Sequence, residues 1–157
     1  MASAPWVLLS YRLPREPSTP RIALWRRLRA LGVAQLGDGL VALPADSRTK
    51  EQLEWLAEEV EQAGGDASIW LAEPSSARQV RALAAQMQAT IAAEYRELTE
   101  AACAALEANV GARKRRLAKL RRELRRVRRR DYFPPPEREL ARAAVEDLAR
   151  SLEEVLA

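Results

Sequence analysis

The sequence contains no histidine, and this absence removes several kinds of chemistry. Without histidine the chain lacks the usual near-neutral proton shuttle and every Ser-His or Cys-His nucleophile pair. With only one cysteine, it also lacks the ligands of most common zinc sites. No pair of carboxylates stands out from ordinary helix-surface charge. We therefore expect a protein that is not an enzyme and that carries no metal or other cofactor.

The single cysteine, Cys103, rules out an internal disulfide and fits a reducing cytoplasm. It lies in an Ala-rich segment, where we expect it to be a small buried packing residue. No run of 18 apolar residues is present, which predicts no transmembrane helix. The first residues also lack the basic and long apolar regions of a secretory leader. These features predict a cytoplasmic protein with no membrane partner.

Aromatic residues are scarce, at 5% of the chain, but four of them are tryptophans in the first half. A chain of 157 residues suits one small domain with a helical extension. Large aromatic side chains contribute much of the buried surface of small cores. We therefore expect the packed core in the first half, with Trp6, Trp25, Trp55 and Trp70 inside it.

The first half is predicted to contain a strand and a helix, then a hairpin of two strands, and then a second helix and a last strand. Residues 6–13 are short and apolar, as in a buried strand. Thr19-Pro20 predicts a helix start, and Gly32 predicts its end. Two short apolar runs flank Gly37-Asp38-Gly39, a triplet that suits a tight turn.

A second helix and a fourth strand complete this region. Thr49 with Gln52 resembles a capping box, and the helix that follows ends at Gly64-Gly65. Residues 67–72 then read as a strand closed by Pro74. The order strand, helix, strand, strand, helix, strand predicts an α+β fold, a ferredoxin-like βαββαβ domain over residues 1–74.

Residues 75–157 predict a helical extension. A long Ala-rich helix should run to about Asn109, and a basic helix should occupy residues 112–130. The sequence DYFPPP then stops it, because consecutive prolines cannot continue a helix. A last helix over 137–156 should turn four apolar residues inward: Leu140, Val145, Leu148 and Leu152.

The charge of the chain is unevenly distributed. The net charge is +4, but residues 113–130 alone carry +11, which leaves −7 for the rest. An apolar seam with spacings of 3, 4 and 3 crosses this basic segment at Leu117, Leu120, Leu124 and Val127. The cations around the seam are Arg113, Lys114, Arg115, Arg116, Lys119, Arg121, Arg122, Arg125, Arg126, Arg128, Arg129 and Arg130.

Two interpretations of the basic helix compete. In the first, the seam packs on a neighbour and the outer cations bind nucleic-acid phosphates, for which Arg is well suited. In the second, the cations pair with acidic helices of this chain or of a partner, so the helix is a structural or interaction module. Nothing in the sequence specifies which bases would be recognised.

Arginines also gather near the first predicted strand and helix. A helix start beside arginines suits a small oxyanion. Ordinary solvated charge explains the same cluster. The candidate residues are Arg12, Arg15 and Arg21.

Several segments have distinctive sequences, and they occur in one order along the chain. They are WVLLSYRLPREPSTP at 6–20, WRRLRAL at 25–31, LGDGLVALP at 36–44, EQLEWLAEEVEQAG at 51–64 and DYFP at 131–134. Together they resemble the N-terminal domain of chromate-resistance regulators, the ChrB family. Residues 25–44 are more distantly similar to the central ferredoxin-like domain of PaaX-type phenylacetate repressors.

This resemblance implies a function and an assembly. It implies a bacterial, cytoplasmic homodimer that regulates transcription of chromate-efflux genes. DNA and a second copy of the chain are then the expected partners. The resemblance carries over no ligand residue for chromate, so the basic helix is the DNA-binding candidate that the residues themselves supply.

Overall fold

The N-terminal half is built on a four-stranded antiparallel sheet with the strand order β2-β3-β1-β4. The computed structural model describes residues 5–156. The central strand β1 pairs with both β3 and β4. The predicted α+β class with a βαββαβ start is confirmed. The strands are β1 Trp6–Arg12, β2 Ala34–Gly37, β3 Leu40–Pro44 and β4 Asp66–Ala72.

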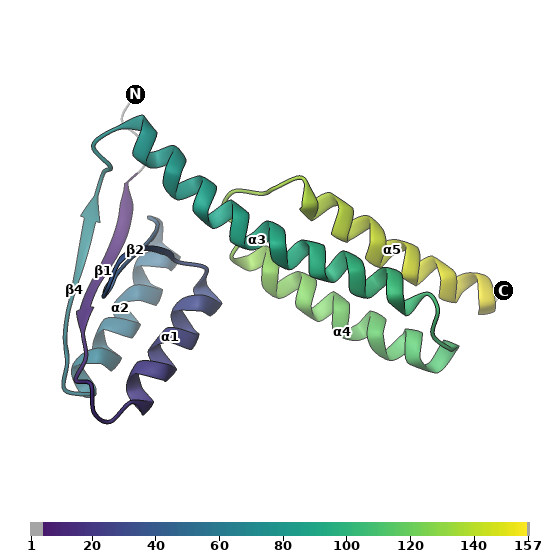
Figure 1. Ribbon diagram of the computed structural model, residues 1–157, viewed down its shortest axis with the longest axis horizontal. Helices are drawn as coiled ribbons and strands as arrows, with labels where there is room; N and C mark the ends of the chain where they lie inside the picture. The colour runs from purple at the N-terminus through teal and green to yellow at the C-terminus, as the bar shows by residue number, and fades with distance from the viewer. Residues whose placement is uncertain (1–4, 157) are drawn as a thin grey trace. The chain divides into compact units, whose positions relative to one another are not determined.

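Helices α1 (Thr19–Leu31) and α2 (Ser47–Gln62) cover one face of this sheet (Figure 1). Side chains alternate along a strand, so every second residue of β1 points toward these helices. Val7 and Leu9 of β1 and Leu53 of α2 are fully buried. The inward side chains of the strands and the inward side chains of the helices therefore form one core.

The start of α2 differs from the prediction. Asp46, not Thr49, is the N-cap, because the helix begins at Ser47. The Thr49 N–H donates to Asp46 Oδ1 at 2.7 Å, and the Asp46 N–H donates to Thr49 Oγ1 at 2.9 Å. The Thr49 hydroxyl also donates to the Pro44 carbonyl at 2.7 Å, and the residue is fully buried. The predicted Thr49–Gln52 capping box was therefore wrong, since both residues lie inside the helix.

Replacing Asp46 with Ala should destabilise the protein by about 1 kcal/mol through loss of this cap. The Thr49 N–H bond lowers the pKa of Asp46 below its ordinary value of 3.8. A lowered folded-state pKa means that the cap contributes fully above that ordinary value and is lost as pH falls through the folded pKa. Urea unfolding should show that the difference in unfolding free energy between wild type and variant is smaller at pH 3 than at pH 7. An equal difference at both values would contradict this.

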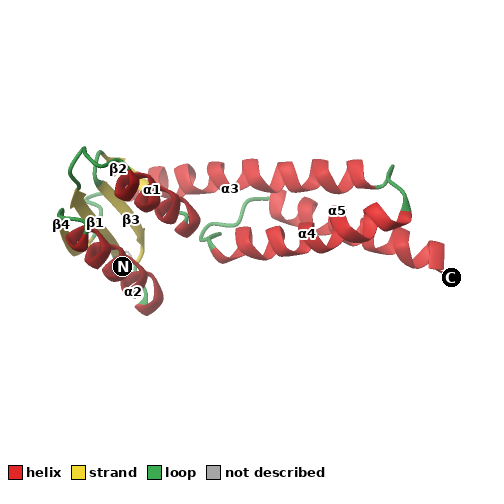
Figure 2. Ribbon diagram, turned by 90° about the horizontal axis from the view of Figure 1, so that it is seen from below, coloured by secondary structure: helices red, strands yellow, loops and turns green. Residues whose placement is uncertain are grey.

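Three helices follow, α3 (Ala77–Ala105), α4 (Val110–Arg129) and α5 (Glu137–Leu156). The chain divides into two compact units between Ala84 and Ala85, inside α3. In the second unit, α3 beyond that point, α4 and α5 lie side by side (Figures 1 and 2). The predicted long helix ends at Ala105, before Asn109, which caps α4 instead.

Several burial predictions were wrong. Leu140 is 62% exposed, because the inward stripe of α5 is Ala141, Val145, Leu148 and Leu152. Cys103 is exposed, although it lies in the predicted Ala-rich helix. Of the four tryptophans only Trp6 is buried, while Trp25, Trp55 and Trp70 are exposed.

Candidate nucleic-acid interface

Helix α4 has clear local reasons to begin and end where it does. The Asn109 side chain accepts a hydrogen bond from the Ala112 N–H at 2.9 Å, so it caps the first turn. The helix ends at Arg129, just before the DYFPPP segment whose prolines lack the N–H that a helix needs. Arg126, Arg128 and Arg129 occupy the last turn, where cations interact favourably with the helix dipole.

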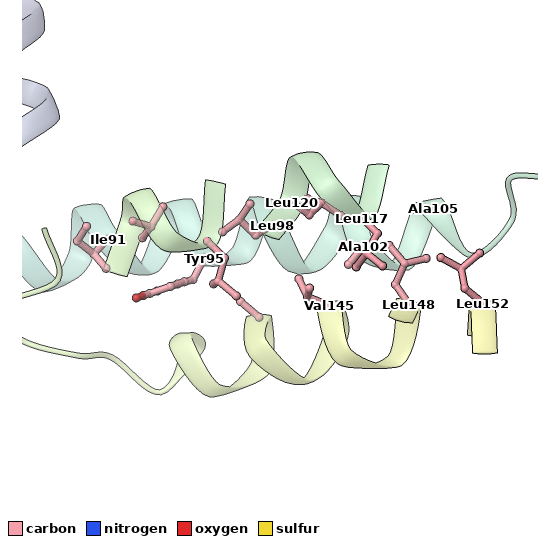
Figure 3. Close-up of a cluster of buried hydrophobic side chains, with 13 residues drawn as sticks. Ile91, Tyr95, Leu98, Ala102, Ala105, Leu117, Leu120, Val145, Leu148 and Leu152 are labelled. Atoms are coloured by element: carbon pink, nitrogen blue, oxygen red, sulfur yellow. The ribbon is translucent and has the colours of Figure 1, made fainter. Parts of the chain in front are cut away.

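The apolar seam fixes which side of α4 faces the solvent. Its four residues are buried among apolar side chains of α3 and α5 (Figure 3). Burial of a Leu or Val side chain contributes roughly 1.5–3 kcal/mol. The predicted seam is therefore confirmed, and it consists of Leu117, Leu120, Leu124 and Val127.

Most of the predicted cations point away from this core and lack acidic partners. Nine of the twelve are exposed and form no ion pair within the described residues. These nine are Lys114, Arg115, Arg116, Arg121, Arg122, Arg125, Arg126, Arg128 and Arg129.

Only three cations of the set have partners among the residues that the structure describes. Arg113 Nε donates to the Ala108 carbonyl at 2.8 Å, and Lys119 Nζ lies 3.9 Å from Glu123 on the same helix. Arg130 pairs with Glu94 of α3. Arg113 and Arg130 lie at the two ends of α4, and Glu123 neutralises only Lys119, so these contacts leave most of the outer face without acidic partners.

In the described residues, four carboxylates of α5 form ion pairs with residues outside α4, and one of them, Glu137, pairs with Arg96 of α3. Arg142 pairs with Glu139 and Glu146, and Arg150 lies 2.8 Å from Asp147, all within α5. Within the described part of the chain, no ion pair joins α5 to α4. The acidic last helix therefore forms no direct ion pair with its basic neighbour among the described residues, although the pKa of Glu139 is lowered by the hydrogen bond from Arg142 and, to a smaller extent, by the charge of Arg128.

The outward arginines have a regular spacing. Residues seven apart lie on nearly the same line of a helix, about 10.5 Å apart along its axis. Arg115, Arg122 and Arg129 form such a line on the side opposite the seam. We call these three residues the arginine ridge. A rigid row of guanidinium groups matches a row of anions better than a flexible tail would.

A buried polar contact holds the segment just after α4. The Tyr95 hydroxyl donates to Asp131 Oδ2 at 2.7 Å, and the Asp131 side chain is fully buried. Asp131 Oδ1 has no hydrogen-bond partner among the described residues. Burial, followed by the bond to Asp131, raises the pKa of Tyr95 above its ordinary value of 10.0. This anchor connects the end of α4 to α3, and sequence patterns gave no signal for it.

Replacing Tyr95 with Phe should destabilise the protein by about 1–3 kcal/mol, because the buried carboxylate loses its donor. The ring volume is kept, so the change isolates the hydrogen bond. Urea unfolding of the variant measures the effect. The control variant Tyr11→Phe removes a tyrosine hydroxyl of the first unit, whereas the anchor lies in the second. A loss of stability for Tyr95→Phe no larger than for that control would contradict the role of the anchor.

The oxyanion candidates are only partly brought together. Arg12 and Arg21 line a cavity of about 970 Å³ with Tyr11, Trp25 and Asp38, but Arg15 does not line it. Burial raises the pKa of Tyr11, while nearby Arg21 lowers it and Asp38 raises it. The cavity is therefore mixed in charge, with two guanidinium groups and one carboxylate.

The described residues offer neither a group of metal ligands nor a helix that could span a membrane. No group of three or more His, Cys, Asp or Glu residues there is placed to hold a metal ion. None of the described helices is long and apolar enough to cross a membrane.

Exposed Trp55 was missed by the sequence interpretation, although a signal was present. The inward stripe of α2 is Leu53, Leu56 and Val60, with spacings of 3 and 4. Trp55 lies on the opposite side of that helix, where a large aromatic residue has no core to join.

Comparisons with known proteins identify relatives of the chain. The family described as Protein ChrB, N-terminal, matches residues 21–156. The chain is also similar to Protein ChrB of Cupriavidus metallidurans, with 36% identity over 66 residues. That match covers 42% of this chain and 20% of the relative, so the chain spans only about a fifth of that protein. No solved structure matches the chain.

Proposed function

The chain belongs to the family of ChrB N-terminal domains, and from this premise we propose that it takes part in regulating chromate resistance by binding DNA. In the proposed mode, α4 contacts the phosphates of duplex DNA. The link to chromate resistance is supported by the family membership. The contact with DNA is supported by the charge and orientation of α4. The observation that carries the contact is the set of nine exposed cations without acidic partners among the described residues, on a helix held by its apolar seam.

Phosphate binding explains why arginine dominates the outer face. A guanidinium group donates two parallel hydrogen bonds to a phosphate, which a lysine ammonium cannot do. Each phosphate neutralised releases condensed counterions, so affinity depends steeply on salt. The outer face carries no Asn, Gln or aromatic side chain, so its contacts to DNA come from Arg and Lys. We expect these cations to contact mainly phosphates, which position the protein without selecting a sequence. An arginine that reaches guanine would add sequence preference.

Neutralising the arginine ridge tests this function. Replacing Arg115, Arg122 and Arg129 with Gln should reduce the slope of log K against log salt by about one for each phosphate that the ridge no longer neutralises. A control variant with Arg26, Arg78 and Arg81 changed to Gln removes the same charge from exposed positions outside α4. Anisotropy titrations of a labelled duplex at several salt concentrations give the slopes. Equal slopes for both variants would refute the proposed binding mode.

A second candidate function is the binding of a small oxyanion, chromate or sulfate. The observation favouring it is the cavity that Arg12 and Arg21 share. Calorimetry with each ion should then give heat that disappears when both arginines are replaced with Ala. Absence of heat with the wild-type protein would remove this candidate and leave the DNA proposal unaffected.

A further inference from the structure

The outer face of α2 carries an acidic ridge, with an exposed tryptophan beside it. Trp55 is 65% exposed, and the ridge lies opposite the buried stripe of the helix. We define the acidic ridge as Glu51, Glu54, Glu58 and Glu61, which recur at spacings of 3, 4 and 3. Such spacings place residues on one side of a helix.

Most of this ridge lacks positive partners. Glu54 lies 3.7 Å from Lys50 on the same helix, and the neighbouring Glu59 pairs with Arg27 of α1. Glu51, Glu58 and Glu61 form no ion pair within the described residues. Three carboxylates of this ridge are therefore unpaired among the described residues, on the exposed side of α2.

A groove of about 410 Å³ lies beside Trp55, between α1 and α2. Its apolar wall includes Ala30, Leu31 and Leu56, and its charged lining residues are Arg27, Arg48, Glu51 and Glu59, of which Arg27 and Glu59 pair with each other. At the same groove, Gln52 has a buried Oε1 atom with no hydrogen-bond partner among the described residues. An exposed aromatic side chain beside an apolar groove with charged neighbours is typical of a protein-binding surface.

We propose that this surface binds α4 of a second copy of the chain. The two ridges have opposite charge, and both repeat at helical spacings, so carboxylates of one copy face guanidinium groups of the other. A guanidinium over the Trp55 ring adds a cation–π contact, and arginine stems cover the apolar groove. The same ring–cation contact already occurs within the first unit, where Arg29 lies 4.8 Å from the centre of the Trp25 ring.

Each copy has one acidic ridge and one arginine ridge. Two copies therefore satisfy both ridges reciprocally, as in a two-fold symmetric dimer. Because DNA phosphates and carboxylates would use the same outer face of α4, a bound duplex displaces the second copy. The proposed association of two copies is tested without nucleic acid, so its failure can be distinguished from a failure of the proposed DNA binding.

Sedimentation at low salt tests the association. The wild-type chain should sediment with twice the 17.6 kDa mass of one chain. Two variants should each sediment as single chains. The first variant changes Glu51, Glu58 and Glu61 to Lys, and the second changes Arg115, Arg122 and Arg129 to Glu.

Mixing the two variants distinguishes a second copy from a contact within one chain. The mixture restores one native pair of ridges, the acidic ridge of the second variant with the arginine ridge of the first. Species of twice the single-chain mass should return in the mixture. Recovery supports the proposal, whereas a mixture that stays monomeric, like a monomeric wild type, overturns it.

Matched controls separate the surface from general charge and hydrophobicity. Glu97, Glu100 and Glu107 are exposed and form no ion pair in the described residues, so changing them to Lys gives the same charge change away from α2. Trp55→Ala should weaken the association about tenfold or more, as for a central aromatic contact. Trp70→Ala, at a tryptophan that is 59% exposed, should leave it unchanged. Equal effects of the two tryptophan changes, or loss of dimer in the control glutamate variant, overturn the assignment.

Discussion

Changing Arg121, Arg122, Arg125 and Arg126 to Glu should lower the affinity for duplex DNA by about a thousandfold or more at low salt. All four side chains are exposed and form no ion pair within the described residues, so their reversal leaves the Leu117–Val127 seam intact. The outer face then repels phosphates instead of attracting them. Anisotropy titration at about 50 mM salt, with circular dichroism to confirm folding, gives the result.

A control with the same net charge separates position from total charge. Arg15, Arg26, Arg78 and Arg81 are also exposed, and none lies on α4. Their change to Glu should reduce affinity far less, because their charges act on DNA only through the screened long-range field. Similar decreases in affinity for both variants would show that net charge, rather than α4, determines binding.

Replacing Leu148 with Ala should destabilise the protein by about 2–5 kcal/mol. Leu148 is fully buried in the cluster that joins α3, α4 and α5 (Figure 3), so its truncation leaves a cavity against the seam. Urea unfolding measures the decrease in stability. The same change at Leu140, which is 62% exposed on the same helix, should cost less than about 0.5 kcal/mol. Equal effects at the two positions would contradict the observed orientation of α5.

Periodicity predicted much of the fold because it reports which residues share one side of an element. The spacing of 3, 4 and 3 identified the seam of α4, and all four of its residues are buried. The same approach failed for α5, because Leu140 is more hydrophobic than Ala141 but lies on the wrong side. Ala141 is fully buried, since a small residue lets neighbouring helices pack closely.

The sequence predicted only some features of the candidate site. The sequence identified the cations of α4, because charge is a local property. Which of them are paired depends on residues far away in the chain: Arg130 meets Glu94, and Asp131 meets Tyr95, each 36 positions apart. No local pattern encodes such pairs, because each joins residues that are far apart in the sequence.

The affinity of the wild-type chain for a duplex at two salt concentrations tests the central claim most directly. About six phosphate contacts correspond to a slope near −5, so affinity should fall about thousandfold between 50 and 200 mM salt. The sample should have a known oligomeric state at each concentration, because a second copy would compete for α4. An affinity that hardly changes with salt, or no binding at 50 mM, would contradict the claim that the basic helix binds DNA phosphates.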